Sequence, residues 1–356
     1  MIVPLIIAVV GLSAGFLLIW RVPVCPPACA YDAPGLSIVI PARNEERNLA
    51  RLLASLPAAG APPLEVLVVD DESTDETAAI AEALGAKVVR SQPLPPGWTG
   101  KAWACQQGAE RSSGSTLLFL DADTYLQPGG LDRTLSLWSR YRDSRLVFSI
   151  LPYHETTAEY EQLSLVFNIL MAAGAGGFGV RALPRLFGQS LLIDKSMYFA
   201  AGGHSAVRDF ILENLRFASR IQEAGGRILC FGGRGTMHMR MFPDGMRQMS
   251  ESWAKAFVQG AAASGHGVVM YSIVWISALW SVVLLIGLDV ANRGALLMIY
   301  LLLALQLAWL ARQFGSYRPL TCLIYPVPLS YYCAVFSRSA LRRMLKQKSV
   351  WRGREV

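Results

Sequence analysis

Hydrophobic residues follow two patterns along this chain. Residues 2–20, 268–288 and 294–311 form unbroken apolar runs without a charged side chain, and 320–337 is a similar stretch interrupted by two prolines. Between the first two runs, from about residue 35 to 243, short apolar stretches alternate with stretches of helical spacing. The pattern predicts one globular domain flanked by apolar segments.

The alternation within residues 35–243 is typical of an α/β domain. Strands are expected at 36–41, 64–69, 86–89 and 116–120, and helices at 44–56, 72–84, 99–112 and 131–141. Strands that alternate with helices predict a parallel, doubly wound sheet of the Rossmann-like type. Ligands of such sheets bind beyond the carboxyl ends of the strands, so the residues that end each strand are the candidates for function.

The first apolar run is long enough to cross a bilayer. Its 19 residues would form a helix of roughly 28 Å, close to the ~30 Å hydrocarbon core. A signal peptide is the alternative, but no basic residue precedes the run and Arg21 follows it. We therefore expect residues 1–21 to be a transmembrane anchor, with the next domain in the cytoplasm.

The later apolar runs and the C-terminal charges extend this topology. Residues 268–288 and 294–311 are each long enough to span. The segment 338–356 contains seven basic residues and one acid, which is most of the net charge of +7. A full span at 320–337 would place this tail outside, against the positive-inside rule, so a re-entrant segment is expected and a fourth span is the alternative. The prediction is a multi-pass protein of the cell membrane whose basic tail is cytoplasmic.

Composition agrees with a membrane protein rather than a nucleic-acid binder. Hydrophobic residues make up 53% of the chain and charged residues 17%, which is too apolar for an ordinary soluble enzyme. The basic residues gather beside an apolar segment, where they suit anionic lipid headgroups. The six cysteines have no zinc spacing, and reduced thiols are the simpler interpretation.

Residues 244–264 show the pattern of an amphipathic helix. Met246, Trp253 and Phe257 recur at helical spacing on one side. Such a helix with a tryptophan, just before a span, predicts an element that lies in the membrane interface. Trp253 and Lys255 would then lie on the acceptor side, and packing against the catalytic domain is the alternative.

Acidic residues follow three of the expected strands. Glu45 follows the first strand, Asp70 and Asp71 end the second, and Asp121 and Asp123 follow the strand at 116–120. Carboxylates gathered at one sheet edge repel one another. A divalent cation that prefers oxygen ligands, Mg²⁺ or Mn²⁺, would relieve this repulsion and neutralise the diphosphate of a nucleotide-sugar. A polar turn after a strand is the alternative.

Neighbouring residues are candidates for holding the nucleotide. The two acids of the second strand could bind base and ribose, although Ser73 and Glu76 also form a capping-box pattern for the next helix. Arg43 and Lys101 could contact the base or the diphosphate, or lie in solvent.

Taken in order, these residues resemble glycosyltransferase family 2. The resemblance is carried by residues 38–45 (IVIPARNE), 69–75 (VDDESTD) and 120–123 (LDAD), and covers about 36–260. It implies a GT-A fold and inverting transfer of a hexose from a nucleotide-diphosphate sugar such as UDP-glucose, with a divalent metal. Donor binding is implied for Pro41, Ala42, Arg43, Glu45, Asp70, Asp71, Lys101 and Asp121, and metal binding for Asp121 and Asp123.

Finer features are similar to the carotenoid-acid and hopanoid-associated members, nearest to the diaponeurosporenoate glycosyltransferase group. They include residues 96–105 (PGWTGKAWAC), 240–243 (RMFP) and 252–257 (SWAKAF). This resemblance implies a carotenoid or terpenoid carboxylic acid as acceptor. A polyprenyl phosphate is the alternative acceptor, and a catalytically degenerate membrane scaffold is the alternative to an enzyme. His204 is either structural or near the acceptor.

The chain departs from the family at the general base. Where the family carries Glu-Asp at the start of a helix, this sequence has Glu213-Asn214. Glu213 or Asp209 could serve as the base, or no base is needed. A carboxylic acid acceptor is already ionised at pH 7, whereas a hydroxyl must lose a proton during attack. We therefore expect an anionic acceptor. The alternative is that Asn214 only caps a helix and Glu213 serves as the base.

Overall fold

The computed structural model describes residues 2–32, 35–57, 60, 62–141, 143, 145–175, 177–180, 186–210, 213–263, 265–344, 350–351 and 354–355. The chain divides into two compact units. Unit 1 comprises Met1–Arg21, Glu155–Leu183 and Met241–Val356, and unit 2 comprises Val22–His154 and Pro184–Arg240. Residues 155–183, which we predicted to lie inside a continuous domain at 35–243, therefore group with the helices of unit 1.

Unit 2 is built on a seven-stranded sheet with the order β3-β2-β1-β4-β8-β6-β9. Its strands are β1 (Leu36–Ala42), β2 (Glu65–Asp70), β3 (Lys87–Arg90), β4 (Thr116–Leu120), β6 (Leu146–Leu151), β8 (Ser190–Asp194) and β9 (Arg227–Gly232). Strands β1 to β4 are parallel as predicted, but β8 runs antiparallel to β4 and β6. The prediction of a parallel sheet is therefore wrong at β8, which makes the sheet mixed, whereas β6 and β9 are again parallel to each other. Strand β8 begins beside the carboxyl end of β4, where Ser190 pairs with Leu120. A parallel strand would need a crossover back to the amino end of β4, and without one β8 runs antiparallel.

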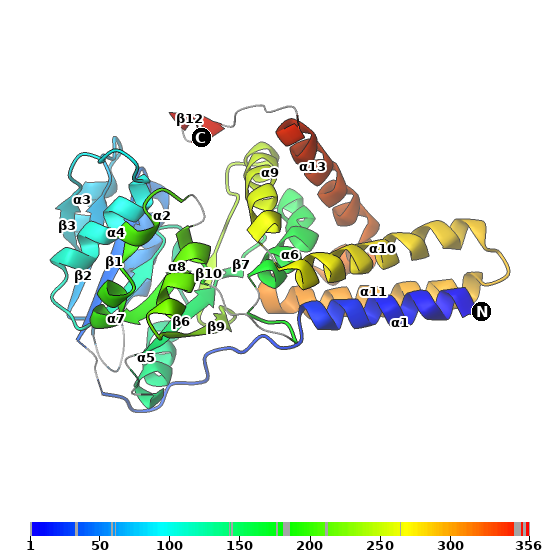
Figure 1. The fold of residues 1–356 in the computed structure, drawn as a ribbon, viewed down its shortest axis with the longest axis horizontal. Helices are drawn as coiled ribbons and strands as arrows, with labels where there is room; N and C mark the ends of the chain where they lie inside the picture. Colours follow the sequence, from blue (N-terminus) through cyan, green and yellow to red (C-terminus); the bar gives the residue numbers. More distant parts are fainter. Residues whose placement is uncertain are drawn as a thin grey trace. The chain divides into compact units, whose positions relative to one another are not determined.

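The helices of unit 2 include those predicted at 44–56, 72–84, 99–112 and 131–141, and the structure adds a small second sheet (Figure 1). They are α2 (Glu46–Ser55), α3 (Thr77–Ala83), α4 (Gly100–Arg111), α5 (Gly130–Tyr141), α7 (Lys195–Ala200), η2 (His204–Val207) and α8 (Glu213–Glu223), with β5 (Thr124–Leu126), β10 (Met237–Met239) and β7 (Tyr153–His154) as a second sheet. Leu49, Leu52 and Leu53 of α2 are buried, as their helical spacing predicts. Leu36, Ile38, Ile40 and Ala42 of β1 are buried in the same core.

Unit 1 is almost entirely helical in the part that the structure describes. Its elements are α1 (Ile2–Leu18), η1 (Glu159–Ser164), α6 (Leu165–Gly174), α9 (Met246–Ala263), α10 (His266–Leu288), α11 (Arg293–Phe314), α12 (Pro319–Leu323) and α13 (Pro326–Met344), with the short pair β11 (Val350–Trp351) and β12 (Arg354–Glu355).

Helices α1, α10 and α11 lie along one another in Figure 1. Gln306 of α11 is buried between them; its amide nitrogen donates to the Leu12 carbonyl of α1 (2.8 Å) and its oxygen accepts from Trp275 Nε1 of α10 (3.1 Å). A Cβ on Gly15 would lie 2.5 Å from the Gln306 amide oxygen, so glycine permits the close approach of α1. Small residues and a polar bridge are typical of helices that associate without a hydrophobic driving force.

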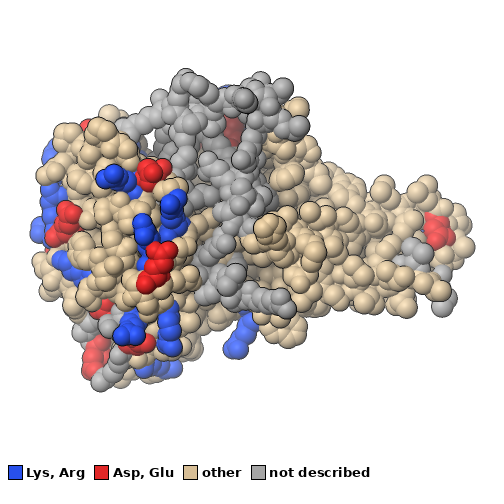
Figure 2. All heavy atoms as spheres, in the orientation of Figure 1, with Lys and Arg blue, Asp and Glu red and all other residues tan. Residues whose placement is uncertain are grey.

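Two described helices, α10 and α11, are long and apolar enough to cross a membrane by length and composition. The anchor predicted at 1–21 is not one of them, because α1 has only 17 residues. The segment predicted at 320–337 is divided between α12 and α13, and Pro326 begins α13, where its missing N–H costs no helical hydrogen bond. On the face drawn in Figure 2, the described surface of α10 and α11 carries few charged side chains, whereas unit 2 carries both signs.

Helix α9 occupies most of the amphipathic segment that we predicted at 244–264. Its Trp253 is 2% exposed and stacks on Phe167 of α6, with ring centroids 4.9 Å apart and an interplanar angle of 13°. The prediction that this tryptophan faces a membrane interface is therefore wrong, because its ring is buried within unit 1. The side chain of Lys255 lies outside the described part of the chain.

Candidate active site

The carboxyl ends of β1, β2 and β4 meet at one edge of the sheet, as predicted. Ala42 of β1 pairs in register with Asp70 of β2, and the Ala42 carbonyl accepts a hydrogen bond from the Asp71 amide (2.8 Å). Strand β4 lies on the other side of β1 and ends at Leu120, directly before Asp121. The parallel register therefore brings the acidic clusters that follow these strands to one rim.

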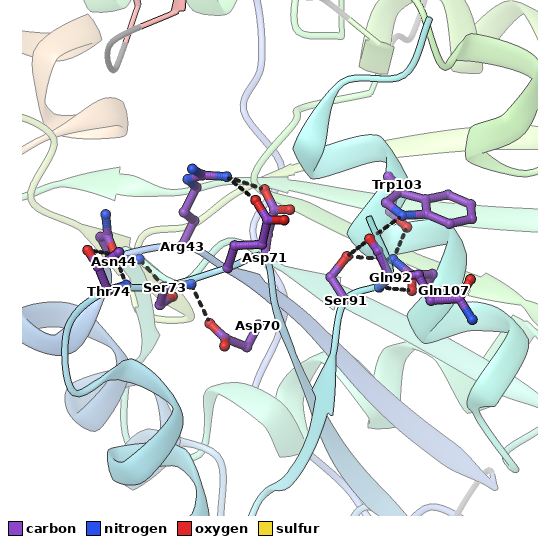
Figure 3. Close-up of polar contacts among 11 residues, drawn as sticks. Arg43, Asn44, Asp70, Asp71, Ser73, Thr74, Ser91, Gln92, Trp103 and Gln107 are labelled. Carbon is purple, nitrogen blue, oxygen red and sulfur yellow. Dashed lines mark hydrogen bonds and ion pairs between the residues drawn. The ribbon is translucent and has the colours of Figure 1, made fainter. Parts of the chain in front are cut away.

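The loops after β1 and β2 are bonded to each other (Figure 3). The Asn44 amide donates to Ser73 Oγ (3.0 Å), and Asn44 Oδ1 accepts from the Thr74 amide (2.8 Å). Asn44 and Glu72 both have left-handed backbone conformations, with φ of 55° and 57°. Such conformations are costly for residues other than glycine and persist only where surrounding contacts impose them. The rim is therefore held in a defined shape.

The predicted capping box at Ser73 and Glu76 is wrong. Helix α3 begins at Thr77, whose amide donates to Asp75 Oδ1 (3.1 Å), and Ser73 instead accepts from the β1 loop. Glu45 is one of the residues of the first loop that are predicted to bind the donor. Its carboxylate accepts a hydrogen bond from Nδ2 of Asn48 (2.8 Å), in the helix α2 that follows this loop. Both side chains thus stabilise the loops on which the rim is built.

Asp70 and Asp71 point to different sides of the strand end (Figure 3). Asp71 faces Arg43, with 3.4 Å between its carboxylate and Nη1. Asp70 is 8% exposed and accepts from the Ser73 amide (3.2 Å), so it closes the turn. Of this pair, Asp71 is the better candidate for contacting a ligand, because its carboxylate faces the Arg43 side chain whereas that of Asp70 is used in the turn.

The first turn of α4 lies against Asp71. A Cβ on Gly100 would be only 2.4 Å from Asp71 Oδ2, so glycine allows the carboxylate to approach the start of the helix. The partial positive charge of a helix N-terminus favours an anion at this place. Arg43 and the start of α4 therefore both lie beside the Asp71 carboxylate.

A hydrogen-bond network attaches the loop after β3 to α4 (Figure 3). Gln107 accepts from the Gln92 amide (2.9 Å) and donates to Ser91 Oγ (2.7 Å), and Trp103 Nε1 donates to the Gln92 carbonyl (3.0 Å). The Ser91 amide in turn donates to the Asp70 carbonyl (2.9 Å). The loop therefore forms a fixed wall beside the end of β2.

Lys101, on the same turn of α4 as Gly100, bonds to the residue that follows β4. Its ammonium lies 2.7 and 2.9 Å from the two carboxylate oxygens of Asp121 and 2.9 Å from the Gly188 carbonyl. The Asp121 amide donates to the Gln189 carbonyl (3.0 Å). Asp121 is thus fixed at both its main chain and its side chain.

A small cavity of about 30 Å³ opens beside this ion pair. Lys101, Asp121, Gly188, His204 and Asn214 contribute its polar lining, and the rest is apolar. The cavity unites residues from β4, α4, η2 and α8 that are as far apart in sequence as Lys101 and Asn214. It therefore places the residue at the family's base position beside the acidic rim.

Asn214 has a structural partner in this cavity. Its Nδ2 donates to the Leu186 carbonyl (2.6 Å). The adjacent Phe187 amide donates to Ser149 Oγ (2.8 Å). The segment 186–189 is consequently held by side chains on both sides, and Asn214 positions the carbonyls that contact Lys101 and Asp121.

Of the other two base candidates, only the side chain of Asp209 is described. Asp209 is exposed and does not line the cavity. The side chain of Glu213 lies outside the described residues. Sequence reasoning missed the segment 186–189; its only signal was the Gly188-Gln189 turn directly before the apolar run of β8.

The described residues contain no group of three or more His, Cys, Asp or Glu side chains that would hold a metal by themselves. This arrangement differs from a dedicated protein cage. It is compatible only with an ion that takes most of its ligands from elsewhere, as Mg²⁺ does from substrate phosphates.

Comparison with known sequences decides the family. Residues 37–216, just over half of the chain, match the family described as "Glycosyl transferase family 2". The chain belongs to glycosyltransferase family 2.

This glycosyltransferase is similar along most of its length to curated relatives. It is 28% identical over 335 residues to the 4,4'-diaponeurosporenoate glycosyltransferase of Staphylococcus aureus strain MRSA252, covering 91% of this chain and 89% of the relative. The protein of that name from strain USA300 matches with the same identity and coverage. A mannosyltransferase from Pyrobaculum calidifontis, solved with GDP-Man and Mn²⁺, has a TM-score of 0.56 at 16% identity, covering 97% of this chain and 98% of that one. Its likeness, with the mixed sheet, shows a GT-A-like α/β fold.

The Asn214→Asp variant of the glycosyltransferase is expected to be less stable than the wild type, by about 1–3 kcal/mol. A carboxylate would face the Leu186 carbonyl across the 2.6 Å that the amide now bridges. Urea unfolding measures the change, and Asn214→Ala, which removes the donor without adding charge, is the matched control. We also expect no gain in transfer to hydroxyl acceptors; a clear gain would show that position 214 still functions as a base position.

Acid is expected to destabilise the glycosyltransferase partly through His204. Burial, helped by the charge of Lys101, lowers the pKa of His204 from 6.5 to about 3. Between these values the unfolded chain binds a proton that the folded one does not, so stability falls as pH drops from 6.5 towards 3, by at most about 1.4 kcal/mol per unit. Urea unfolding at pH 7, 5 and 4 should show a shallower pH dependence for His204→Gln than for the wild type. An unchanged slope would contradict this assignment.

Proposed function

We propose that this glycosyltransferase transfers a hexose from a nucleotide-diphosphate sugar to an anionic, lipid-like acceptor at a membrane surface. The observation that carries the proposal is the row of Asp71, Lys101 and Asp121 along one edge of the sheet. It alternates carboxylates, which suit hydroxyl donors, with an ammonium that suits phosphate.

The nucleoside is assigned to the end of the row nearest β2 and β3. Asp71 and Arg43 face each other there, beside the wall that Gln107 and Trp103 stabilise. The diphosphate is assigned to Lys101 and Asp121, next to the cavity. On this assignment the anomeric carbon lies beyond the diphosphate, towards Asn214.

A divalent cation, Mg²⁺ or Mn²⁺, fits this site. Asp121 already holds a cationic group, the Lys101 ammonium, against both carboxylate oxygens, and Asp123 follows it by two residues on the same turn. Asp121 and Asp123 would hold the ion, with donor phosphate oxygens as its other ligands. The bound ion would supply neutralisation of the charge on the departing nucleoside diphosphate.

The acceptor is proposed to be a carotenoid or other terpenoid carboxylic acid. The support is the amide at position 214, which donates to a main-chain carbonyl and offers no basic atom for removing a proton. An ionised carboxylate needs no such removal. Its oxygen attacks the anomeric carbon with inversion, the bond from that carbon to the diphosphate oxygen breaks, and a glycosyl ester and the nucleoside diphosphate result. The relatives named for diaponeurosporenoate agree with this class of acceptor.

Membrane attachment is proposed through α10 and α11, with α1 packed beside them through Gln306. We infer that unit 2 and the basic residues 338–356 face the cytoplasm. The apolar acceptor would then reach the enzyme from the bilayer. UDP-glucose is the proposed donor.

The test is transfer in membranes that contain either the wild type or Asp123→Ala, each supplied with a panel of radiolabelled nucleotide-sugars. We expect a new lipid product only with the wild type, and its cleavage by mild alkali would identify an ester. A product released by mild acid would indicate a polyprenyl phosphate acceptor and overturn the carboxylic acid. If the protein bound nucleotide but transferred no sugar with Mg²⁺ or Mn²⁺, the proposed transferase activity would be wrong and a catalytically degenerate scaffold would be favoured.

A further inference from the structure

The ammonium of Lys101 occupies a position that a metal ion would need. It contacts both carboxylate oxygens of Asp121, at 2.7 and 2.9 Å, so a cation already lies beside each oxygen. The third contact is the Gly188 carbonyl at 2.9 Å. Three oxygens thus surround one internal cation.

This arrangement is held from several directions. The Asp121 amide is bonded to Gln189, and Asn214 holds Leu186, so the oxygens of Asp121 and Gly188 are fixed relative to each other. Both charged side chains are mostly covered, with exposed fractions of 33% for Lys101 and 25% for Asp121. A partly buried pair is screened less by salt than a surface pair.

A divalent ion binds Asp121 weakly while the ammonium remains there, because two cations at one carboxylate repel each other at close range. The described residues offer no third His, Cys, Asp or Glu that would compensate. A nucleoside diphosphate changes this balance, since its oxygens can accept the ammonium and also ligate the ion.

We propose that Lys101 is an internal counter-ion that blocks metal binding at Asp121 until a nucleoside diphosphate arrives and takes the ammonium. Metal and donor then enter together, and a metal alone binds weakly. This inference rests on the proposed donor site and adds an order of binding to it. It makes Lys101 a positioning residue as well as a phosphate contact.

The test measures Mn²⁺ binding without any nucleotide, by the loss of free Mn²⁺ signal in electron paramagnetic resonance. We expect Lys101→Met to bind Mn²⁺ about ten-fold more tightly than the wild type. Lys195→Met is the matched control, because Lys195 also donates to a main-chain carbonyl, that of Ser112, but at the opposite edge of the sheet. Its Mn²⁺ affinity should equal that of the wild type.

Two further measurements complete the test. The double variant Lys101→Met with Asp121→Asn should lose the gain in Mn²⁺ affinity, because that gain requires the Asp121 carboxylate that Lys101 no longer holds. Adding UDP should tighten Mn²⁺ binding more in the wild type than in Lys101→Met, because only the wild type has an ammonium that the diphosphate draws away from Asp121. Lys101→Gln keeps a donor for the Gly188 carbonyl and replaces the methionine variant if thermal unfolding shows that the latter does not fold.

Equal Mn²⁺ affinity of the wild type and both Lys101 variants would contradict the proposed role of Lys101 as a counter-ion. A gain that survives in the double variant would also overturn it, because the ion would then bind elsewhere. Failure of the proposed function is distinguishable, since it appears as absent sugar transfer while the nucleotide-free Mn²⁺ titrations remain as expected.

Discussion

The Asp121→Asn variant is expected to lose sugar transfer by about 100-fold or more while it keeps its fold. The substitution preserves the shape of the side chain but removes the charge that holds Lys101 at 2.7 Å. The amide oxygen of the variant can still accept from the Lys101 ammonium, which also keeps the Gly188 carbonyl, so the loss of stability should be small. The rate should fall because the same carboxylate is the proposed ligand of the metal that stabilises the leaving diphosphate.

The measurement is kcat/KM for the nucleotide-sugar at saturating acceptor, with thermal unfolding as the check on folding. Asp143→Asn is the matched control: Asp143 pairs with Arg227 at 3.4 Å, at the amino ends of β6 and β9 on the opposite edge of the sheet. It should retain the wild-type rate. If Asp121→Asn kept more than half of the activity, the assignment of this rim to the donor would be wrong.

Gly100→Ala should raise the donor KM by about ten-fold. The new methyl group would lie 2.4 Å from Asp71 Oδ2, so the carboxylate must move away from the helix start and from Arg43. The clash involves the end of a side chain rather than main chain, and the free energy of unfolding should therefore change little. The cost appears in donor binding, because Asp71 is the proposed nucleoside contact.

Gly267→Ala is the matched control for this prediction. Gly267 also lies in the first turn of a helix, α10, but a Cβ there would come no closer than 3.9 Å to Tyr271, which is ordinary contact. Steady-state kinetics with varied nucleotide-sugar should show a raised KM only for the variant at position 100. Equal KM values for both variants would remove Asp71 from the donor site.

Local patterns were enough to place the strands that carry the candidate site. Buried strands β1, β2 and β4 follow from short apolar runs, and α2 and α4 from helical spacing. The acids that follow β2 and β4 could be predicted to converge, because parallel neighbours end at one edge. The apolar runs of α10 and α11 were equally visible, since their composition alone defines them.

The tertiary structure decided which of these side chains work together. Whether Asp70 or Asp71 faces Arg43 depends on a turn closed through Ser73, and the partner of Lys101 depends on β4. The direction of β8 and the burial of Trp253 likewise depend on segments distant in the chain.

What the amino-acid sequence determined by itself is the family, the order of its strands and helices up to β4, and the apolar helices, because each of these depends on residues within one turn or one strand of each other. The role of Asn214 was decided only by folding. Its amide meets the Leu186 carbonyl 28 residues away, and no periodicity within the chain reports a contact of that kind.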